Sequence, residues 1–375
     1  MKKVLFLIHD LGPGGAEKVL VNLVNNLDKK KYDVSVLALF GGGINEQYLK
    51  PEVHYSIVFK NVFPGNSRIM TLFSPRFLYK KFIKAEYDIV ISYLEGPSAR
   101  IVSGCNNKDV KLVSWIHCKI DTPQIASIGF RNFKEAKQCY QRFHYTVCVS
   151  EWVKQYFTET FSFDNTIGVL YNTNETKEIL SKAKEEITDI VFSKDCFNIC
   201  SVGKVAKVKS FERLIEIHKK LLEDGIKNHV YILGTGAEQA KLEKRVHEYG
   251  LEKTFTFMGY NTNPYKYVKN CDLYVCSSLS EGFSTAVTEA LIVGTPVVTT
   301  LCSGMQEMLG QNNEYGIVTL NNEEALYQGI KRLLENAELL KHYKEMAQER
   351  GKYFSTENTV RAVEEMLDNL LHLEL

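Results

Sequence analysis

The chain has 375 residues, of which 45% are hydrophobic and 24% are charged, and its formal net charge is +1. This composition is that of an ordinary soluble globular protein, and the length suits about two domains. A net charge so close to zero gives no global field that would favour nucleic acid as a partner.

Local features exclude further classes of protein. The nine cysteines show neither C-x-x-C nor metal-ligand spacing, which indicates free thiols in a reducing cytoplasm. No apolar run reaches about 18 residues, so no transmembrane helix is expected. The apolar run at the N-terminus ends at His9 and Asp10 without a small-residue cleavage site, so it is not expected to be a signal peptide.

The first expected element is a buried parallel strand at residues 4–8, because its apolar run is short and continuous. A loop with Gly14 and Gly15 follows, and apolar residues then recur at helical spacing. This order is typical of a phosphate-binding loop, but Glu17 stands where the dinucleotide pattern G-x-G-x-x-G needs its third glycine. The pattern argues against a dehydrogenase and leaves two interpretations, a phosphate-facing loop and a tight turn without a ligand.

Strands and helices continue to alternate through the first half of the chain. Further strand-like runs lie at residues 34–40, 88–93, 110–116 and 146–149. Such alternation predicts a doubly wound parallel sheet, whose ligands lie at the carboxyl ends of its strands. His117 directly follows one of these runs. It is therefore a candidate site residue, although a lone histidine is more often structural.

A second alternating set begins with a strand at residues 197–202, which leads into a lysine-rich loop. The loop contains Lys204 and Lys209 and precedes an amphipathic helix. It lacks P-loop spacing, which would need a glycine at Val208. It is either a loop that holds phosphates or a solvated basic loop. Three more strand-like runs follow, at residues 230–233, 254–258 and 273–276.

Two glutamates, Glu281 and Glu289, flank the junction at which a loop opens a helix near Ser284, and Pro296 starts the next strand. Unpaired N–H groups at such a helix start attract anions. The carboxylates can accept hydrogen bonds from hydroxyl groups. Phosphates for the amides and hydroxyls for the carboxylates together describe a nucleotide sugar, whereas the alternative is an amphipathic helix with two solvated glutamates.

This stretch resembles the E-x7-E signature of the retaining GT-B glycosyltransferases of family 4, also called glycosyl transferases group 1. Glu281 and Glu289 match the two glutamates, and the G-T-P segment that ends at Pro296 matches as well. The lysine-rich loop is similar to the family pattern G-R-x-x-x-x-K-G-F. Lys209 matches its lysine, whereas Lys204 replaces the arginine, which keeps the charge but loses the bidentate fork.

The resemblance implies an α/β protein of the GT-B fold, in which two Rossmann-like doubly wound domains face each other across a cleft. Residues 1–172 would form the N-terminal acceptor domain, and residues 173–354 the C-terminal domain that binds the nucleotide-sugar donor. Thr173 departs from the small or cyclic residue that the family usually has at this boundary. A helix at about residues 355–375 would cross back and pack on the N-terminal domain.

The resemblance also implies roles for the matching residues. Glu281 and His117 are the expected catalytic residues, because Glu281 would orient the donor sugar and His117 would shape the face on which it reacts. Glu289 would hold the ribose, and the two lysines would hold the diphosphate. The expected donor-binding residues are Gly14, Gly15, Lys204, Lys209, Tyr260, Gly282, Phe283, Ser284, Thr285 and Glu289.

The activity that the resemblance implies is retaining transfer of a sugar from a nucleoside diphosphate sugar, with UDP as the expected nucleotide. The sequence contains no D-x-D motif, so neither a metal nor a cofactor is expected. Two alternatives stay open, a sugar-nucleotide epimerase of the same fold and a non-catalytic partner subunit of a glycosyltransferase. The presence of His117, both glutamates and both lysines argues against the partner subunit.

The expected acceptor is a glycan or a lipid-linked oligosaccharide, because the matching motifs resemble bacterial enzymes of capsule and exopolysaccharide assembly. Residues 76–84 interleave cations with aromatic and aliphatic side chains, and a second basic segment spans residues 131–142. Such segments suit an anionic membrane surface. The protein is therefore expected in the cytoplasm, peripheral at the inner face of the cell membrane, unless both segments are ordinary solvated amphipathic helices.

Overall fold

The computed structural model describes residues 1–162, 166–302 and 304–372. The chain divides into two compact units, of which unit 2 is Glu175–Ser355 and unit 1 combines Met1–Asn174 with Thr356–Leu375. The division falls two residues beyond the expected boundary. All nine cysteines lie in the described part, and each is a free thiol, as expected.

Unit 1 contains a sheet of seven parallel strands in the order β3-β2-β1-β4-β5-β6-β7. The central strands β4 and β5 are buried along their whole length, because helices cover both faces of a parallel sheet. The strands are β1 (Lys2–Ile8), β2 (Tyr32–Phe40), β3 (His54–Phe59), β4 (Ile89–Ser92), β5 (Lys111–Ile116), β6 (Tyr145–Cys148) and β7 (Thr166–Val169).

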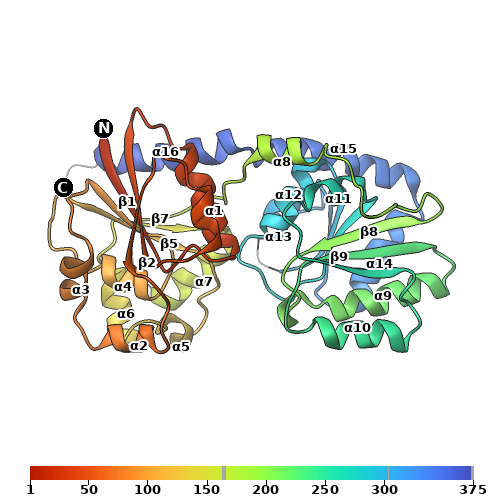
Figure 1. Ribbon diagram of the computed structural model, residues 1–375, viewed down its shortest axis with the longest axis horizontal. Coiled ribbons are helices and arrows are strands. Elements are labelled where there is room, and N and C mark those ends of the chain that lie inside the picture. Colours follow the sequence, from red (N-terminus) through yellow and green to blue (C-terminus); the bar gives the residue numbers. More distant parts are fainter. Residues whose placement is uncertain (163–165, 303, 373–375) are drawn as a thin grey trace. The chain divides into compact units, whose positions relative to one another are not determined.

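Figure 1 shows α1 and α16 on one face of this sheet, and α4 and α6 on the other. The C-terminal helix α16 packs on unit 1, as expected, and its end beyond residue 372 lies outside the described residues. Glu364 accepts a hydrogen bond from the amide of Asp28 at 2.7 Å, and Asp368 accepts one from the Tyr32 hydroxyl. The helices of unit 1 are α1 (Gly15–Asn26), η1 (Ile44–Tyr48), α2 (Asn66–Thr71), α3 (Pro75–Phe82), α4 (Pro97–Val102), α5 (Pro123–Ala126), α6 (Phe133–Tyr140), α7 (Glu151–Phe161) and α16 (Thr356–His372).

Unit 2 contains a sheet of six parallel strands in the order β10-β9-β8-β11-β12-β13. Its core packs residues of β8, β9 and β11 against the apolar stripe of α9, which includes Phe211, Leu214 and Ile215. The strands are β8 (Phe197–Val202), β9 (Asn228–Leu233), β10 (Phe255–Gly259), β11 (Leu273–Cys276), β12 (Val297–Thr300) and β13 (Ile317–Thr319).

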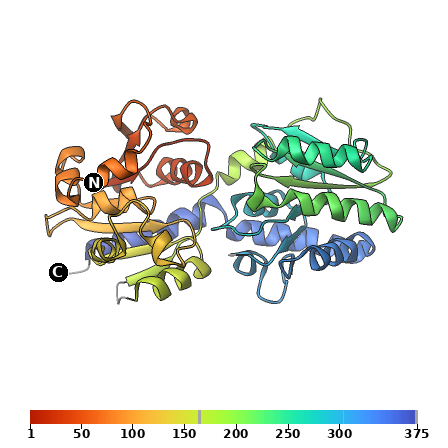
Figure 2. The ribbon, with the colours of Figure 1, turned by 90° about the horizontal axis from the view of Figure 1, so that it is seen from below.

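Helices cover both faces of this second sheet, with α8, α11, α12 and α15 on one face and α9, α10 and α14 on the other (Figure 1). Figure 2, seen from below, looks onto the green helices α9 and α10 in front of the strands. The helices of unit 2 are α8 (Thr176–Lys182), η2 (Lys207–Lys209), α9 (Phe211–Glu223), α10 (Gln239–Glu248), α11 (Tyr265–Asn270), α12 (Thr285–Val293), α13 (Met305–Leu309), α14 (Glu323–Leu334) and α15 (Ala337–Tyr353).

The doubly wound parallel sheets predicted from the alternating pattern are confirmed in both units. The prediction missed β13, an edge strand of unit 2, and β3 and β7, the two edge strands of unit 1. Strands β3 and β7 each have one neighbour instead of two, and much of each stays accessible to solvent, so neither carries the continuous apolar run of a buried strand. Among the described residues, no helix is both long and apolar enough to cross a membrane.

Candidate active site

The strand order of unit 2 reverses between β8 and β11, which are neighbours in the sheet although two strands separate them in the chain. Ligands of doubly wound sheets bind beyond the carboxyl ends of the strands at this point of reversal. The loops that leave β8 and β11, residues 203–210 and 277–284, both end there. Half of the ten expected donor-binding residues lie in these two loops, together with Glu281.

An ion pair joins the two loops. Nζ of Lys209 and Oε1 of Glu281 are 2.6 Å apart, and the hydroxyl of Ser278 donates to the same carboxylate oxygen at 2.6 Å. The lysine and glutamate side chains are only 20% and 13% exposed. Burial is the largest single influence and acts to lower the pKa of Lys209, but the charge of Glu281, its hydrogen bond to the lysine and smaller contributions from nearby cysteines together raise the pKa above its usual value. The lysine is thus held in its charged form beside the glutamate.

Backbone contacts fix the position of this pair. The Ser277 hydroxyl donates to the carbonyl of Lys209 at 2.7 Å, and the amide of Leu279 donates to the carbonyl of Val208 at 2.7 Å. The lysine loop therefore moves together with the loop that carries Glu281. Such preorganisation lets charged groups stabilise a developing charge without reorganising first.

Two glycines allow the lysine loop to pack closely on its other side. A Cβ atom at Gly234 would lie 2.0 Å from the carbonyl oxygen of Gly203, and one at Gly236 would lie 2.2 Å from that of Val205. These distances are far below van der Waals contact. Any larger residue at either position would push the loop that carries Lys209 out of place.

The helix α12 begins one residue after Ser284, as the sequence predicted, and Ser284 is its N-cap. The side chain of Ser284 does not cap the helix, which leaves the amides of the first turn, from Thr285 onwards, without that partner. Gly282 and Phe283 lead into this turn, and the ring of Phe283 lies 5.8 Å from that of buried Phe354. This aromatic contact anchors the loop next to the helix start.

Glu289 has surroundings different from those of Glu281. It lies on α12, it is 9% exposed, and the Tyr265 hydroxyl donates to its Oε1 over 3.3 Å. Lys204 and Tyr260 are exposed and follow the carboxyl ends of β8 and β10. Among the contacts of the described residues, neither of these two touches the Lys209–Glu281 pair. The sequence therefore predicted that Lys204 and Tyr260 lie at strand ends. It did not predict the ion pair between Lys209 and Glu281.

The remaining expected residues, Gly14, Gly15 and His117, belong to unit 1. Gly14 is the N-cap of α1, and the carboxylate of Glu17 folds back over it, so that a Cβ atom at Gly14 would lie 1.9 Å from Oε2. Burial, and to a lesser extent the charges of Asp10 and Glu95, raise the pKa of Glu17. The loop is thus a turn in which the Glu17 carboxylate lies directly against Gly14.

His117 follows β5 and lies against the ring of Tyr93, with ring centroids 4.8 Å apart. Its backbone amide donates to Oε2 of Glu95 at 3.1 Å, and the Cys118 thiol donates to the other oxygen of the same carboxylate. Nε2 of His117 is buried and has no hydrogen-bond partner among the described residues. Burial lowers the pKa of His117 to about 3, so the ring is neutral near pH 7. It offers a hydrogen-bonding nitrogen, not a cation.

Sequence reasoning missed several residues that complete these surroundings, namely Tyr93, Glu95, Tyr265 and Ser278. A signal existed for three of them. Tyr93 and Glu95 follow β4, and Ser278 follows β11, at the carboxyl ends where ligands of parallel sheets lie. No comparable signal exists for Tyr265, which reaches Glu289 only because α11 packs on α12.

The buried neutral state of His117 predicts a pH dependence of stability. The pKa is about 3 in the folded chain, against an ordinary value of 6.5, so the unfolded chain binds the proton more readily between these values. The unfolding temperature should therefore fall as the pH drops from about 6.5 towards 3, and His117 should add no slope above that window. A His117→Gln variant should show a shallower fall in thermal scans, whereas His342→Gln, at an exposed position, should match the unchanged chain. Equal slopes in all three proteins would contradict the buried neutral histidine.

Two doubly wound units of this kind, each with its candidate residues at the strand ends, define the GT-B fold. The family described as Glycosyl transferases group 1 matches residues 183–350, and the family described as Glycosyltransferase Family 4 matches residues 13–177. The chain belongs to these glycosyltransferases.

Individual relatives agree with this assignment. The chain is 29% identical over 369 residues to the N-acetylgalactosamine-N,N'-diacetylbacillosaminyl-diphospho-undecaprenol 4-alpha-N-acetylgalactosaminyltransferase of Campylobacter jejuni, a match that covers 94% of this chain and 96% of that protein. It is 23% identical over 371 residues to the amylovoran biosynthesis glycosyltransferase AmsD of Erwinia amylovora, covering 98% and 100%.

Solved structures share the fold. A glycosyltransferase from Rickettsia africae superposes with a TM-score of 0.78 at 17% identity, over the full length of both chains. HepE of Anabaena, solved in complex with UDP, superposes with a TM-score of 0.76 at 17% identity, covering 98% of this chain and 100% of HepE.

Proposed function

We propose that this protein is a retaining glycosyltransferase that moves a sugar from a UDP-sugar to a lipid-linked glycan acceptor. The observation that carries the proposal is the largely buried Lys209–Glu281 pair, which lies where the strand order reverses, with Glu281 in the loop that leads to the start of α12. A cation and helix amides suit a diphosphate, and a carboxylate beside them suits sugar hydroxyls.

In the proposed reaction, the bond between the anomeric carbon and the diphosphate oxygen breaks, and its electron pair stays on the leaving UDP. Lys209, Lys204 and the amides at the start of α12 stabilise that charge, and each charge-assisted hydrogen bond contributes about 1.5–3 kcal/mol. The acceptor oxygen attacks from the same face, and its proton passes to the leaving phosphate. Glu281 orients the sugar, Glu289 holds the ribose, and neutral His117 shapes the reacting face, so no protein nucleophile takes part.

The nucleotide and the acceptor are proposed from the relatives. HepE has been solved with UDP and with UDP-glucose. The name of the Campylobacter jejuni relative describes transfer of N-acetylgalactosamine to an undecaprenol-linked diphospho-sugar. We extend these two properties to this chain, which implies that it meets its acceptor at the inner face of the cell membrane.

The proposal predicts sugar transfer by the purified chain in excess EDTA, because lysines and amides replace the metal of D-x-D enzymes. The donors to compare are UDP-N-acetylgalactosamine and UDP-glucose, with a polyprenyl-diphosphate-linked N-acetylgalactosamine as acceptor. The rate should change by less than about twofold on adding Mg²⁺, since a metal that carried the charge would contribute several kcal/mol. The anomeric proton coupling of the product should show an α-linkage.

Three outcomes of the same assay would contradict parts of the proposal. Complete loss of transfer in EDTA with recovery in Mg²⁺ would contradict the metal-independent mechanism. Conversion of the UDP-sugar without any acceptor would identify an epimerase. Activity only after a second protein is added would identify a partner subunit.

A further inference from the structure

The turn between α2 and α3 presents a group of apolar side chains to solvent. Leu72 is 75% exposed, Phe77 is 50% exposed and Phe73 is 44% exposed, and the rings of the two phenylalanines stack with centroids 5.2 Å apart. Ile69, on the last turn of α2, is exposed as well. We call these four residues the α2–α3 patch. Large contiguous apolar surfaces are uncommon on soluble proteins and mark sites of interaction.

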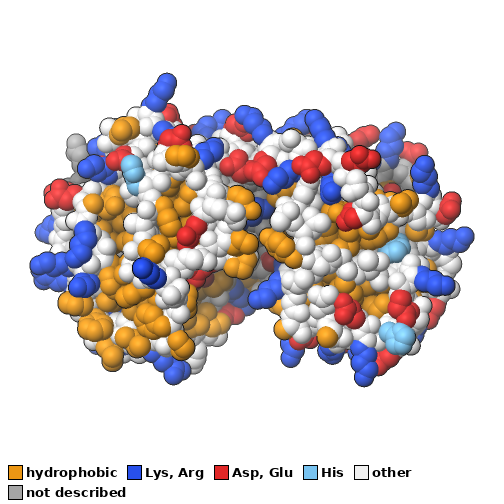
Figure 3. Space-filling view, viewed as in Figure 1, with side chains coloured by type: hydrophobic (Ala, Val, Ile, Leu, Met, Phe, Trp, Pro, Cys, Tyr) orange, Lys and Arg blue, Asp and Glu red, His pale blue; other side chains and the backbone are white. Residues whose placement is uncertain are grey.

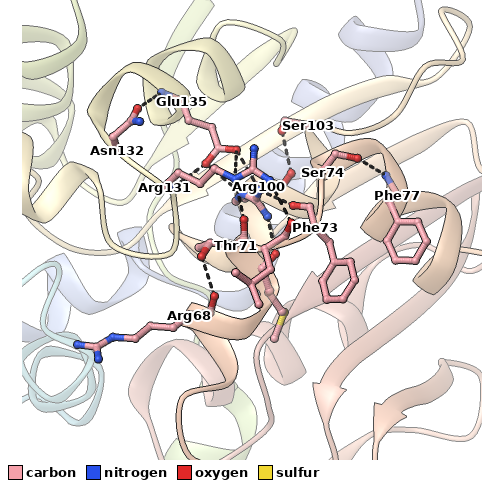
Figure 4. A network of polar contacts seen from close by, with 12 residues as sticks. Arg68, Thr71, Phe73, Ser74, Phe77, Arg100, Ser103, Arg131, Asn132 and Glu135 are labelled. Carbon is pink, nitrogen blue, oxygen red and sulfur yellow. Dashed lines mark hydrogen bonds and ion pairs between the residues drawn. The ribbon is translucent and has the colours of Figure 1, made fainter.

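Two arginines hold the backbone of this turn, Arg100 from the interior and Arg131 from the surface (Figure 4). The guanidinium of Arg100, a side chain that is only 1% exposed, donates to the carbonyls of Met70 at 2.9 Å and Phe73 at 2.6 Å. The guanidinium of Arg131 donates to the carbonyls of Thr71 at 2.7 Å and of the following residue at 3.3 Å. Four consecutive carbonyls therefore point towards arginines.

Glu135 fixes the arginines in turn. Its carboxylate accepts two hydrogen bonds from Arg100, at 2.9 and 3.1 Å, and one from the backbone amide of Arg131 at 2.6 Å. Figure 4 shows the rings of Phe73 and Phe77 directed away from this polar network. The exposure of the patch is thus imposed by a buried ion pair and is not the result of a loose loop.

The charges around the patch are of one sign. Residues 66–84 contain five cations and no carboxylate, and all five cations are exposed, namely Arg68, Arg76, Lys80, Lys81 and Lys84. None of the five forms an ion pair within the described part of the chain. Figure 3 shows apolar side chains gathered in the lower left, where Figure 1 places α2 and α5, and Ile128, just after α5, is 64% exposed. The apolar surface therefore lies in a cationic surround.

Two of the four cations in residues 131–142 bind backbone carbonyls, and contact of this segment with lipid stays a prediction. Arg131 binds the carbonyls of the α2–α3 turn, and the guanidinium of Arg142 donates to the carbonyl of Cys105. Both arginines therefore serve the fold. Within residues 76–84, Leu78 and Ile83 are buried. The exposed apolar side chains lie instead at the start of α3 and in the residues before it.

We propose that the α2–α3 patch inserts into the headgroup region of an anionic lipid bilayer, with its cations on the lipid phosphates. A membrane suits this surface because apolar side chains bind the acyl boundary and about 1 kcal/mol comes from each well-placed cation. A second copy of the chain does not suit it, since two such patches in contact would bring like charges together. The inference specifies how the proposed transferase reaches a lipid-linked acceptor, and in that sense rests on the proposed function.

Co-sedimentation of the full chain with vesicles tests the proposal. Binding should be measurable with equal amounts of phosphatidylcholine and phosphatidylglycerol, weaker with phosphatidylcholine alone, and weaker as salt rises. A Leu72→Ser/Phe73→Ser/Phe77→Ser variant should bind at least about tenfold more weakly, since each such side chain contributes more than 1.4 kcal/mol when buried. The matched control is Val191→Ser/Leu320→Ser, which removes similarly exposed apolar side chains from unit 2.

A second measurement separates insertion from adsorption. Tryptophan fluorescence of a Leu72→Trp variant should be quenched by brominated lipids, whereas that of Leu320→Trp should not. A Lys80→Gln/Lys81→Gln variant should lose about fivefold in affinity per cation, which corresponds to about 1 kcal/mol each, and should keep the quenching of Leu72→Trp once bound.

Several outcomes would overturn the proposal. They are equal vesicle binding by the triple serine variant, absence of binding by the unchanged chain, and quenching at residue 320 but not at residue 72. A dimer that becomes a monomer in the triple variant, seen by size exclusion, would assign the patch to a second copy instead. Thermal shifts with UDP in the same variants distinguish the membrane proposal from the proposed transferase function. If only membrane insertion is wrong, all the variants still bind UDP.

Discussion

Replacing Lys209 with alanine is expected to weaken UDP binding roughly 10- to 150-fold, since one charge-assisted hydrogen bond contributes about 1.5–3 kcal/mol. Replacing Glu289 with alanine should weaken it about tenfold through loss of the ribose contact. Isothermal titration with UDP measures both effects. Because ligand binding raises stability by mass action, thermal shifts with UDP, GDP and ADP also show whether the base is uracil.

The ion pair with Glu281 gives Lys209→Ala two effects on UDP affinity, and a double variant separates them. Lys209→Ala leaves the carboxylate of Glu281 without its cation. The diphosphate then loses its hydrogen bond to the lysine and is also repelled by the carboxylate. A Lys209→Ala/Glu281→Gln variant removes that repulsion and should recover part of the affinity but none of the turnover. Lys244→Ala, at a lysine that is 77% exposed on α10, is the control and should bind UDP normally. Unchanged affinity in both Lys209→Ala and Glu289→Ala would remove the donor site from these loops.

Replacing Arg100 with alanine is expected to lower the free energy of unfolding of unit 1 by about 3–5 kcal/mol, the usual cost of breaking a buried ion pair. The change leaves Glu135 without its main partner and leaves the carbonyls of Met70 and Phe73 unpaired. Arg100→Lys should restore little of the lost free energy of unfolding, because one ammonium group cannot replace a planar guanidinium with several donors.

The two tryptophans of the chain, Trp115 and Trp152, both lie in unit 1, so their fluorescence during urea unfolding reports on that unit alone. Arg131→Ala is the matched control, since its side chain is 48% exposed and its loss should cost about 0.5–1.5 kcal/mol. If Arg100→Ala and Arg131→Ala had equal and small effects, the interior network would not hold the α2–α3 turn.

The sequence was sufficient for the fold because the buried strands of a parallel sheet leave a strong local signal. The strands predicted at residues 197–202 and 273–276 coincide with β8 and β11. The signal fails at β3 and β7, where one side of the strand has no neighbour and polar residues are tolerated. Local pattern thus finds the interior strands of both sheets but only one of the four edge strands, β10 (Phe255–Gly259).

The candidate site was predictable as a set of positions but not as a set of contacts. Lys209 and Glu281 were each found from motifs, yet their ion pair depends on β8 and β11 being adjacent, which only the strand order establishes. The link from Glu95 to His117 depends in the same way on the neighbouring strands β4 and β5. Spacing along the chain carries no information about either pair.

The division of the chain also constrains the order in which the two units can complete their folding during synthesis. Unit 2 is one continuous segment, whereas unit 1 is complete only when α16 has been added, and Thr356 then donates to the carbonyl of Asn174 at 2.6 Å. During synthesis from the N-terminus, the whole of residues 175–355 leaves the ribosome before the helix that α1 packs against. The nascent chain must therefore keep an unfinished first unit soluble while the second is already able to fold.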